Sequence, residues 1–338
     1  MRTNLAHQGE VLGGAWSAIN KERKPRDVLY RLKIPNSDPP VFERNTTRMA
    51  ELARSYHKNL QSEDLTHPAE SPEYTRLLRQ TLNEIPASQK LHEPAMDEIN
   101  WEISPEQVKK AIHFAKKGST TGTDGYPYKL WKTLATQFEE VKRDKKEGFD
   151  IIGALTTVYT DISTHSIDEQ AGFANGWMCP IYKKKDPTEI CNYRPITLLN
   201  TDYKLLTKVL AIQLMDPIHT LVHPDQAGFI PRRSIFNHIR LAKAIINYTE
   251  VMEENRAIVA LDQEKAYDKI RHDYLWATLE SFGLPPHFTK TVKALYQNAH
   301  TQVAINGVLS RPFKVTCGVR QGDPLSCPLF DLAIKPLV

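Results

Sequence analysis

The sequence is poor in cysteine, and its cysteines are far apart. The four in the chain are Cys179, Cys191, Cys317 and Cys327. None forms the Cys-X-X-Cys pattern of a zinc ribbon, and the set does not suit a disulfide-rich secreted scaffold, so we expect a reducing compartment. His219 and His223 are four residues apart, as two helical metal ligands would be, but no third ligand accompanies them. We interpret that pair as structural.

The sequence also lacks a long hydrophobic run. The start, MRTNLAHQGEVLGGAW, has no apolar core after its early arginine, and no stretch of about 20 apolar residues follows anywhere. We therefore expect no signal peptide, no membrane partner and an intracellular protein. With 41% hydrophobic and 25% charged residues the chain has the composition of a folded protein of two or three domains. Its net charge of +4 permits a polyanionic partner without requiring one.

Three regions differ in texture. Residues 1–98 are charged and dotted with proline, which favours a connector of linker segments and short helices. Residues 99–175 open with a marked helix signal, SPEQVKKAIHFAKKGS, in which Ser104 is the expected N-cap and Gln107 completes a capping box. Residues 176–338 have the densest pattern of regular structure, and we expect the main folded domain there.

Within residues 176–338 the pattern predicts both strands and helices. GWMCPIYKKKDPTEICNYRPITLLN is expected to form two extended arms joined by a basic loop. An amphipathic helix capped by Thr201 or Asp202 is expected next, followed by a second over SIFNHIRLAKAIINYTEVM with Ile239 and Ile246 on its inner face.

Turn signals mark the rest of this region. The Asn-Gly pair at 306–307 predicts a tight hairpin within TQVAINGVLSRPFKVT. Further on, Asp323 is expected to cap a last helix with Pro324 at its first position.

The most informative stretch is RAIVALDQEKAYDKI. Its consecutive apolar residues predict a strand covered on both faces that ends at Asp262. A carboxylate there can simply cap the following turn. However, the basic arms precede it, and Tyr267 and the turn RQGDPLS follow it. A carboxylate for Mg²⁺, cations for a triphosphate and glycine for close backbone approach are the parts of a phosphoryl-transfer site that handles nucleotides.

Five pieces together resemble the reverse transcriptases of non-LTR (LINE-type) retrotransposons. They occur in the family's order from about residue 100 onward: GTDGYPYKLWK, PIYKKKDPTEICNYRPITLLN, DQAGFIPRRS, ALDQEKAYDKI and GVRQGDPLSCPLF. GGAWSAINKERKPRDVLYRL more loosely resembles the connector that precedes the polymerase in these elements. The resemblance implies an α+β fold of right-hand polymerase architecture, with fingers, a partial palm and a mostly helical N-terminal connector.

The resemblance also implies roles for the residues around Asp262. Asp262 matches the first metal-binding aspartate of the family, and the backbone carbonyl of Gln263 would complete the shell of one Mg²⁺ ion. The N–H groups of Lys265 and Ala266 would line the triphosphate, since consecutive free amides bind anions. Tyr267 matches the bulky steric gate that meets the 2′ position of the sugar and favours deoxynucleotides.

Further matches lie in the fingers and in the glycine-rich turn. Arg194 and one of Lys183 or Lys184 match the cations that grip the triphosphate, the arginine through its planar fork. Gln321 and Gly322 match the motif that lies against the nascent base pair and template.

Three arginines are the expected nucleic-acid contacts. Arg320 is expected on the nucleic-acid backbone, next to the Gln-Gly motif. Arg232 and Arg233 are either template contacts or ordinary surface charge.

One departure from the family is large. The family holds two Mg²⁺ ions, about 3.5 to 4 Å apart, with three aspartates. Two of these belong to a Tyr-X-Asp-Asp hairpin, and that tetrapeptide does not occur in the 338 residues. We therefore expect an incomplete or degenerate element copy that is inactive alone. We also expect an open strand edge and a last helix whose apolar face lacks its sheet, and hence poor solubility.

The implied function is that of an RNA-directed DNA polymerase that copies element RNA at a nicked chromosomal target. The implied partners are an RNA template, a DNA primer or target, deoxynucleoside triphosphates and Mg²⁺, in a nuclear or cytoplasmic ribonucleoprotein with no small-molecule cofactor. One alternative is a non-catalytic RNA-binding or scaffold protein derived from a degenerate element. Another is a group II intron maturase or telomerase-like polymerase, although NYRPITLLN resembles the LINE group more.

Overall fold

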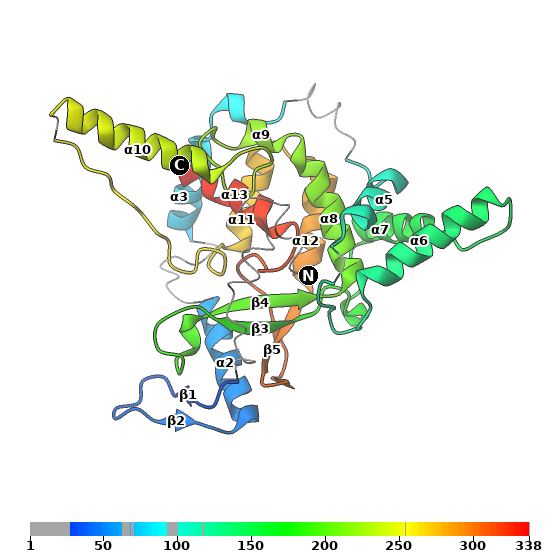
Figure 1. Ribbon diagram of the computed structural model, residues 1–338, viewed down its shortest axis with the longest axis horizontal. Coiled ribbons are helices and arrows are strands. Elements are labelled where there is room, and N and C mark those ends of the chain that lie inside the picture. Colours follow the sequence, from blue (N-terminus) through cyan, green and yellow to red (C-terminus); the bar gives the residue numbers. More distant parts are fainter. Residues whose placement is uncertain are drawn as a thin grey trace, which may run out of the picture.

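The computed structural model describes residues 28–62, 68, 71–92, 101–116, 118–253 and 255–337. Its centre is a small mixed sheet with helices packed against it (Figure 1). The helices run over α2 (Thr46–Leu60), α3 (Pro72–Asn83), α5 (Pro105–Phe114), α6 (Tyr128–Arg143), α7 (Ile151–His165), α8 (Thr201–Met215), α9 (Ile218–Leu221), α10 (Ile235–Val251), α11 (His272–Ser281), α12 (Pro286–Gln297) and α13 (Ser326–Ile334). Short 3₁₀ turns occupy Ala87–Gln89, Glu169–Ala171, Ile190–Asn192 and Lys335–Leu337.

The predicted pair of extended arms is confirmed. β3 (Gly176–Tyr182) and β4 (Tyr193–Leu199) run antiparallel over their full length. β5 (His300–Ile305) lies parallel to β3, and β6 (Val308–Leu309) and β7 (Phe313–Lys314) each pair with β5. The hairpin is confirmed as well: Asn306 and Gly307 have φ angles of 50° and 86°, the positive values that a two-residue type I′ turn requires.

The main core surrounds α8, and it differs from the amphipathic helix that was predicted. Tyr203, Leu206 and Leu210 are all buried, and buried residues occur on every side of this helix. A helix with buried residues on every side lies inside a domain rather than on its surface. The cap also differs, because Asn200 is the N-cap and its side-chain oxygen accepts hydrogen bonds from the GTDG loop at residues 122–125.

The helix signal at Ser104 is confirmed in detail. The amide of Gln107 donates to the Ser104 hydroxyl at 3.3 Å, and the Ser104 amide donates to the Gln107 side chain at 3.2 Å. Val108, Ala111 and Ile112 of α5 point into the main core. This local pattern therefore determined both the start and the buried face of the helix.

Residues 28–62 pack on the sheet and form a second core with it. β1 (Leu32–Lys33) pairs with β2 (Phe42–Glu43), and α2 follows. Met49 and Ala53 of α2 are buried in a cluster with Val303, Ile305 and Phe313 of the sheet. This N-terminal segment therefore shares a hydrophobic core with the strands of the region from residue 176 onward.

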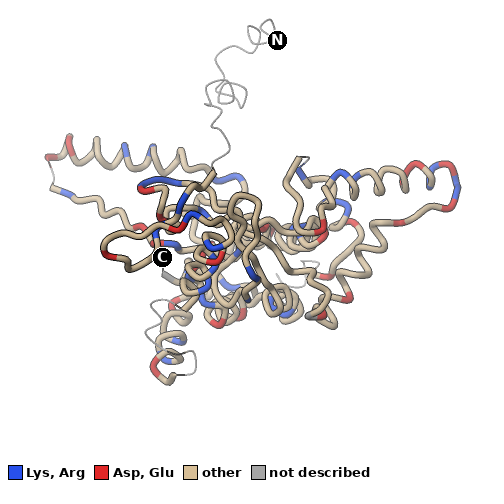
Figure 2. The backbone as a smooth tube through the Cα atoms, turned by 90° about the horizontal axis from the view of Figure 1, so that it is seen from below, with Lys and Arg blue, Asp and Glu red and all other residues tan. Residues whose placement is uncertain are grey.

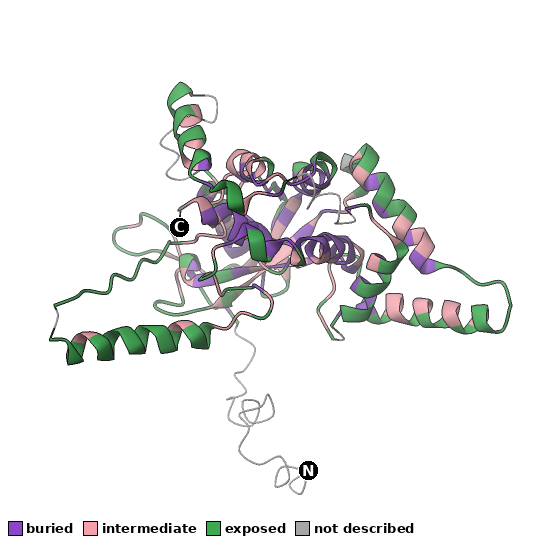
Figure 3. Cartoon of the chain, turned by 90° about the horizontal axis from the view of Figure 1, so that it is seen from above, coloured by how far each residue is buried: buried purple, intermediate pink, exposed green. Residues whose placement is uncertain are grey.

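The strand predicted to end at Asp262 is not formed. Residues 255–263 have no regular secondary structure, and Ile258, Val259 and Leu261 are 66%, 78% and 92% exposed. The preceding helix α10 contains no buried residue, so the predicted inner face of that helix is exposed too (Figure 3). A strand requires a hydrogen-bonded neighbour, and no described segment pairs with this one.

The prediction of a bare last helix was wrong. Leu325, Leu329 and Leu332 are fully buried, in the same core cluster as Leu275 and Leu279 of α11. The helix also starts later than predicted, at Ser326, although the Asp323 carboxylate does accept a hydrogen bond from the amide of Leu325 at 3.0 Å.

All four cysteines are free. Among the helices of the described residues, none combines the length and hydropathy that crossing a membrane would require.

Candidate functional site

Most of the predicted nucleotide-binding residues meet around one cavity of about 330 Å³, here called the cation-lined cavity. The basic arms and the segment after Asp262 contribute Lys183, Arg194, Lys265, Ala266 and Tyr267. Gln321 of the glycine-rich turn and Gln263 complete that side. The fold therefore brings together three segments that are far apart in sequence.

The loop between the two basic arms is held by its own hydrogen bonds. The amide of Lys183 donates to the carbonyl of Asn192 at 3.0 Å, and the Tyr193 hydroxyl donates to the carbonyl of Pro187 at 2.6 Å. Lys183 and Arg194 themselves are exposed, and neither has an ion-pair partner among the described residues. Both cations are therefore available to an anionic ligand, whereas Lys184 lies outside the cavity lining.

The segment after Asp262 forms a tight turn. Lys265 has a φ of 52°, and its carbonyl accepts hydrogen bonds from the amides of Asp268 and Lys269 at 2.9 and 3.2 Å. The amides of Lys265 and Ala266 donate to no described residue. Two successive free N–H groups beside a cation form a small anion-binding concavity.

Tyr267 lines the cavity with one face of its ring covered. Its ring stacks on Phe330 with centroids 4.3 Å apart and planes 17° apart. Its carbonyl accepts a hydrogen bond from Val319 at 2.8 Å, so the turn is fixed to the glycine-rich loop. Burial and the nearby Cys327 thiol raise the pKa of Tyr267, which therefore stays a neutral, bulky wall.

Two further residues of the cavity escaped the sequence analysis. Asp268 lies beside Tyr267, and burial raises its pKa to about 6 despite the opposing effect of Lys265. His57 of α2 is buried, which lowers its pKa to about 4 and keeps its imidazole neutral. Asp268 belongs to the motif ALDQEKAYDKI and so had a sequence signal; His57 lies in the region interpreted as a connector and had none.

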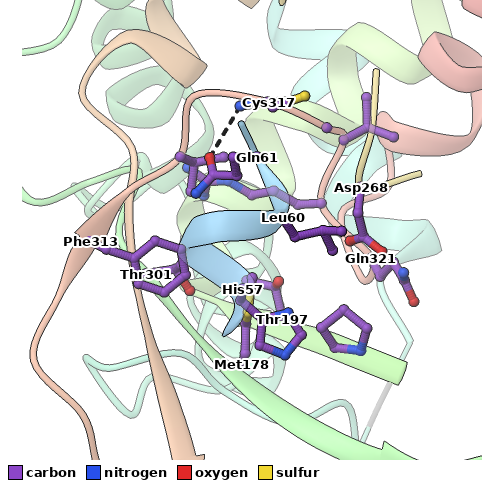
Figure 4. A pocket seen from close by; sticks show the side chains of 15 residues that line it. His57, Leu60, Gln61, Met178, Thr197, Asp268, Thr301, Phe313, Cys317 and Gln321 are labelled. Atoms are coloured by element: carbon purple, nitrogen blue, oxygen red, sulfur yellow. Dashed lines mark hydrogen bonds between the residues drawn. The ribbon is translucent and has the colours of Figure 1, made fainter. Parts of the chain in front are cut away.

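A second, smaller cavity of about 40 Å³ adjoins the first (Figure 4). It shares His57, Asp268 and Gln321 with the cation-lined cavity and adds Gln61 and Thr197. Figure 4 shows the hydrogen bond that the side chain of Gln61, the residue after α2, accepts from the amide of Cys317, which leads into the glycine-rich turn. Helix α2 thus forms part of the wall of both cavities.

The predicted metal ligands are only partly assembled. Asp262 is exposed and is not among the lining residues, although its neighbour Gln263 is. Nowhere in the described part of the chain do three or more His, Cys, Asp or Glu side chains come close enough to hold a metal ion. One carboxylate and one carbonyl are suitable ligands but do not complete a two-ion site, because Mg²⁺ requires near-octahedral oxygen coordination.

Arg320 differs from the prediction. Its side chain is only 5% exposed, and one of its nitrogens donates to the carbonyl of Ala174 at 2.5 Å. The guanidinium carbon lies 5.4 and 5.7 Å from the ring centroids of Tyr203 and Tyr296. In this structure Arg320 is packed in the core, and its side chain lines the smaller cavity rather than the protein surface.

Gly322 is needed by the protein's own backbone. Its φ is 115°, and a Cβ at this position would lie 2.5 Å from the carbonyl oxygen of Thr197 in β4. Gly322 itself is not part of the cavity lining. The sequence predicted a glycine where the backbone approaches another group closely, and at Gly322 that group is the backbone of β4. This contact places the neighbouring Gln321 at the cavity.

Arg232 and Arg233 have different surroundings. The guanidinium of Arg233 donates to the carbonyls of His223 and Gln226 at 2.5 and 2.8 Å, so it stabilises the turn before α10. Arg232 is exposed. Neither side chain lines the cation-lined cavity.

The sequence is similar to those of known proteins. Residues 182–338 match the family described as reverse transcriptase (RNA-dependent DNA polymerase), and this range contains most of the cavity lining. Residues 182–338 therefore form a reverse transcriptase domain of the kind found in non-LTR retrotransposon proteins.

The similarity of the chain to individual relatives supports that assignment. The chain is 30% identical over 291 residues to the transposon TX1 uncharacterized 149 kDa protein of Xenopus laevis, across 85% of this chain and 20% of that protein. It is 29% identical over 147 residues to the Retrovirus-related Pol polyprotein from type-2 retrotransposable element R2DM of Drosophila melanogaster, across 44% of this chain and 14% of that protein. The chain therefore spans about a fifth or less of the length of these two relatives.

Proposed function

We propose that this chain forms the fingers and part of the palm of a right-hand RNA-directed DNA polymerase, and that the cation-lined cavity receives the incoming deoxynucleoside triphosphate. One observation carries the proposal: Lys183, Arg194 and Lys265 come from separate segments and line the same cavity. Neither Lys183 nor Arg194 is neutralised by a described carboxylate. Clustered cations that no protein carboxylate neutralises attract an anionic ligand, and a triphosphate supplies several negative charges.

The lining residues then have distinct roles. Arg194 binds the triphosphate through its planar fork and Lys183 acts as a point charge, while the free amides of Lys265 and Ala266 donate to phosphate oxygens. Tyr267 restricts the space at the 2′ position of the sugar. Gln321 lies against the base pair that forms with the template.

We further propose that Asp262 and the Gln263 carbonyl supply two of the ligands of a two-ion Mg²⁺ site. When bound, the ions would stabilise the attacking and leaving oxygens of nucleotidyl transfer. The described residues supply only part of that site, so we expect the 338-residue chain alone to bind nucleotide without extending a primer.

The template and primer are the expected macromolecular partners, within a nuclear or cytoplasmic ribonucleoprotein. The charge pattern favours attraction of nucleic acid to particular exposed cations rather than to the whole surface. For example, α6 and the loop after it carry both acidic and basic residues (Figure 2). Arg232 is an exposed cation available to nucleic acid, whereas Lys109 is already paired with Glu139 at 2.6 Å.

Nucleotide binding by the purified chain tests the proposal. Titration with dTTP and Mg²⁺ is expected to give saturable binding that Lys183→Ala and Arg194→Ala each weaken about tenfold, the typical effect of losing one charge-assisted hydrogen bond. Lys184→Ala is the matched control because Lys184 lies in the same loop but outside the cavity lining. Equal affinities of all three variants and the wild type would overturn the proposal.

The proposed steric gate has its own test. Tyr267→Ala is expected to bring the affinities for UTP and dTTP close together, whereas Tyr267→Phe, which retains the ring, should keep the preference for dTTP. If the alanine variant discriminates as well as the wild type, Tyr267 is only a packing residue against Phe330.

A non-catalytic RNA-binding protein is the second candidate, and it is favoured because the described residues bring no three metal-binding side chains together. Filter binding to RNA over a series of salt concentrations separates the two. Phosphate contacts give a steep fall in affinity with salt, at a slope of about −0.7 per phosphate contact on single strands. RNA affinity without any dTTP affinity would support the second candidate and contradict the first.

A further inference from the structure

The cation-lined cavity has one wall that lies outside the region matching the reverse transcriptase family. Tyr56, His57 and Leu60 of α2 line the cavity, but the family match covers only residues 182–338. The N-terminal segment thus contributes to a site whose other lining residues all lie within that match.

Polar contacts hold α2 against the sheet region at two places, one within the helix and one just after its end. The carboxylate of Glu51 accepts hydrogen bonds from the amide of Arg311 at 2.7 Å and from its guanidinium at 3.2 Å. Just beyond the helix, the Gln61 side chain donates to the carbonyl of Lys314 at 3.2 Å and accepts from the amide of Cys317 at 3.2 Å. Because Cys317 leads into the turn that carries Gln321, the position of α2 and the position of that turn are linked.

Tyr56 is the α2 residue that contacts a proposed nucleotide-binding residue. The Nζ atom of Lys265 lies 4.5 Å from the centroid of the Tyr56 ring, which is the geometry of a cation–π interaction. Lys265 is at the same time half-buried in a turn with positive φ. The ring therefore restricts where the ammonium group of Lys265 can lie.

The α2 wall is not built like an ordinary core surface. The Tyr56 hydroxyl and the Nε2 atom of His57 are both buried, and neither has a hydrogen-bond partner among the described residues. The two rings are in edge-to-face contact, with centroids 5.0 Å apart. Unpaired buried polar atoms are costly, so a helix that only covered the sheet would be expected to present apolar side chains here.

We propose that Tyr56 is a positioning residue of the nucleotide site, which holds the Lys265 ammonium group toward the triphosphate. Residues 28–62 then form a structural part of that site rather than a separate connector. The identification of the ligand as a triphosphate rests on the proposed function. The contact between Tyr56 and Lys265 can be tested without any ligand.

The first experiment measures the contact in the full 338-residue chain by NMR with ¹³C-labelled lysine. The ε-methylene protons of Lys265, assigned with Lys265→Arg, are expected to be shifted upfield by the ring current of Tyr56. Tyr56→Phe should keep the shift and Tyr56→Leu should remove it, while Lys58→Ala, at an exposed position of the same helix, should leave it unchanged. An unshifted Lys265 signal in the wild type would overturn the proposal without recourse to any variant.

The second experiment measures the consequence for binding. With dTTP and Mg²⁺ as the probe, Tyr56→Leu is expected to weaken binding about three- to tenfold, and Tyr56→Phe is expected to restore it. If Lys183→Ala and Arg194→Ala weaken binding but Tyr56→Leu does not, the positioning role is overturned while the proposed function stands. If none of these variants changes dTTP binding, the proposed function fails, and the Lys265 signal still decides whether the contact exists.

Discussion

The amide of Thr197 in β4 donates a hydrogen bond of 2.7 Å to the carbonyl of Gln321, which fastens the glycine-rich turn to the edge of the sheet. The next residue, Gly322, passes so close to β4 that a Cβ would lie 2.5 Å from the Thr197 carbonyl oxygen. These two contacts place the Gln321 side chain at the cation-lined cavity.

Gly322→Ala is therefore expected to destabilise the fold by roughly 2 kcal/mol or more, through backbone strain and the clash together. Gly118→Ala is the matched control, since Gly118 also has a positive φ, of 78°, but a Cβ there would meet no described atom within 4 Å. Denaturant unfolding of both variants separates the clash from the strain. Equal losses in the two would show that the approach to β4 is not close.

Leu329→Ala is expected to cost about 2 to 5 kcal/mol, because the side chain is fully buried and its removal leaves a cavity. Leu309→Ala, at a position 44% exposed, should change the free energy of unfolding by much less. Urea denaturation followed by circular dichroism measures both. If Leu329→Ala lowered the free energy of unfolding only slightly, the result would contradict the burial of this side chain.

The neutral, buried His57 makes stability dependent on pH. Its pKa is lowered from 6.5 to about 4, so the unfolded chain binds this proton more readily than the folded one. The contribution is fully present above pH 6.5 and is lost as the pH falls toward 4, by on the order of 3 kcal/mol. Asp268, whose pKa is raised to about 6, acts in the opposite direction between pH 6 and 4.

The comparison of wild type with His57→Gln isolates the histidine. The glutamine variant is expected to gain stability relative to the wild type as the pH is lowered from 7 to 4, since Asp268 is common to both. Thermal melts across this range provide the measurement, and two parallel pH profiles would contradict a buried neutral histidine.

Asp331 offers a stabilising substitution. One of its oxygens accepts a hydrogen bond from Gln226 at 2.9 Å, while the other is buried and has no partner among the described residues. Burial raises the pKa of Asp331 to about 7, so the folded state bears the cost of a buried charge above pH 7 and loses it as the pH falls toward 4. Asp331→Asn is therefore expected to stabilise the chain by on the order of 1 kcal/mol at pH 8 and to give no gain near pH 4. Urea denaturation at the two pH values measures the difference, and a variant that is less stable at pH 8 would show that the charge is needed.

Features with local causes were predictable from the sequence. The capping box of Ser104 and Gln107 and the turn at Asn306 and Gly307 depend on residues within four positions of one another, and both are present as predicted. The family motifs also contain most of the residues that line the cavity, although Asp262, Lys184 and Gly322 of the same motifs do not line it.

Features that depend on distant partners were not predictable in this way. The apolar run before Asp262 has the composition of a strand, yet it lies exposed because no described segment pairs with it. Arg320 has the sequence context of a surface cation, but Tyr203 and Tyr296 surround it in the core.

The sequence by itself determined the reverse transcriptase family, the helix and turn signals and the chemical types of residue at the site. Only the tertiary structure decided that α2 completes the cavity, since Tyr56 meets Lys265 across roughly two hundred residues of chain. The physical reason is that side-chain periodicity specifies which face of a helix is buried, while the partner of that face is chosen by the packing of the whole chain.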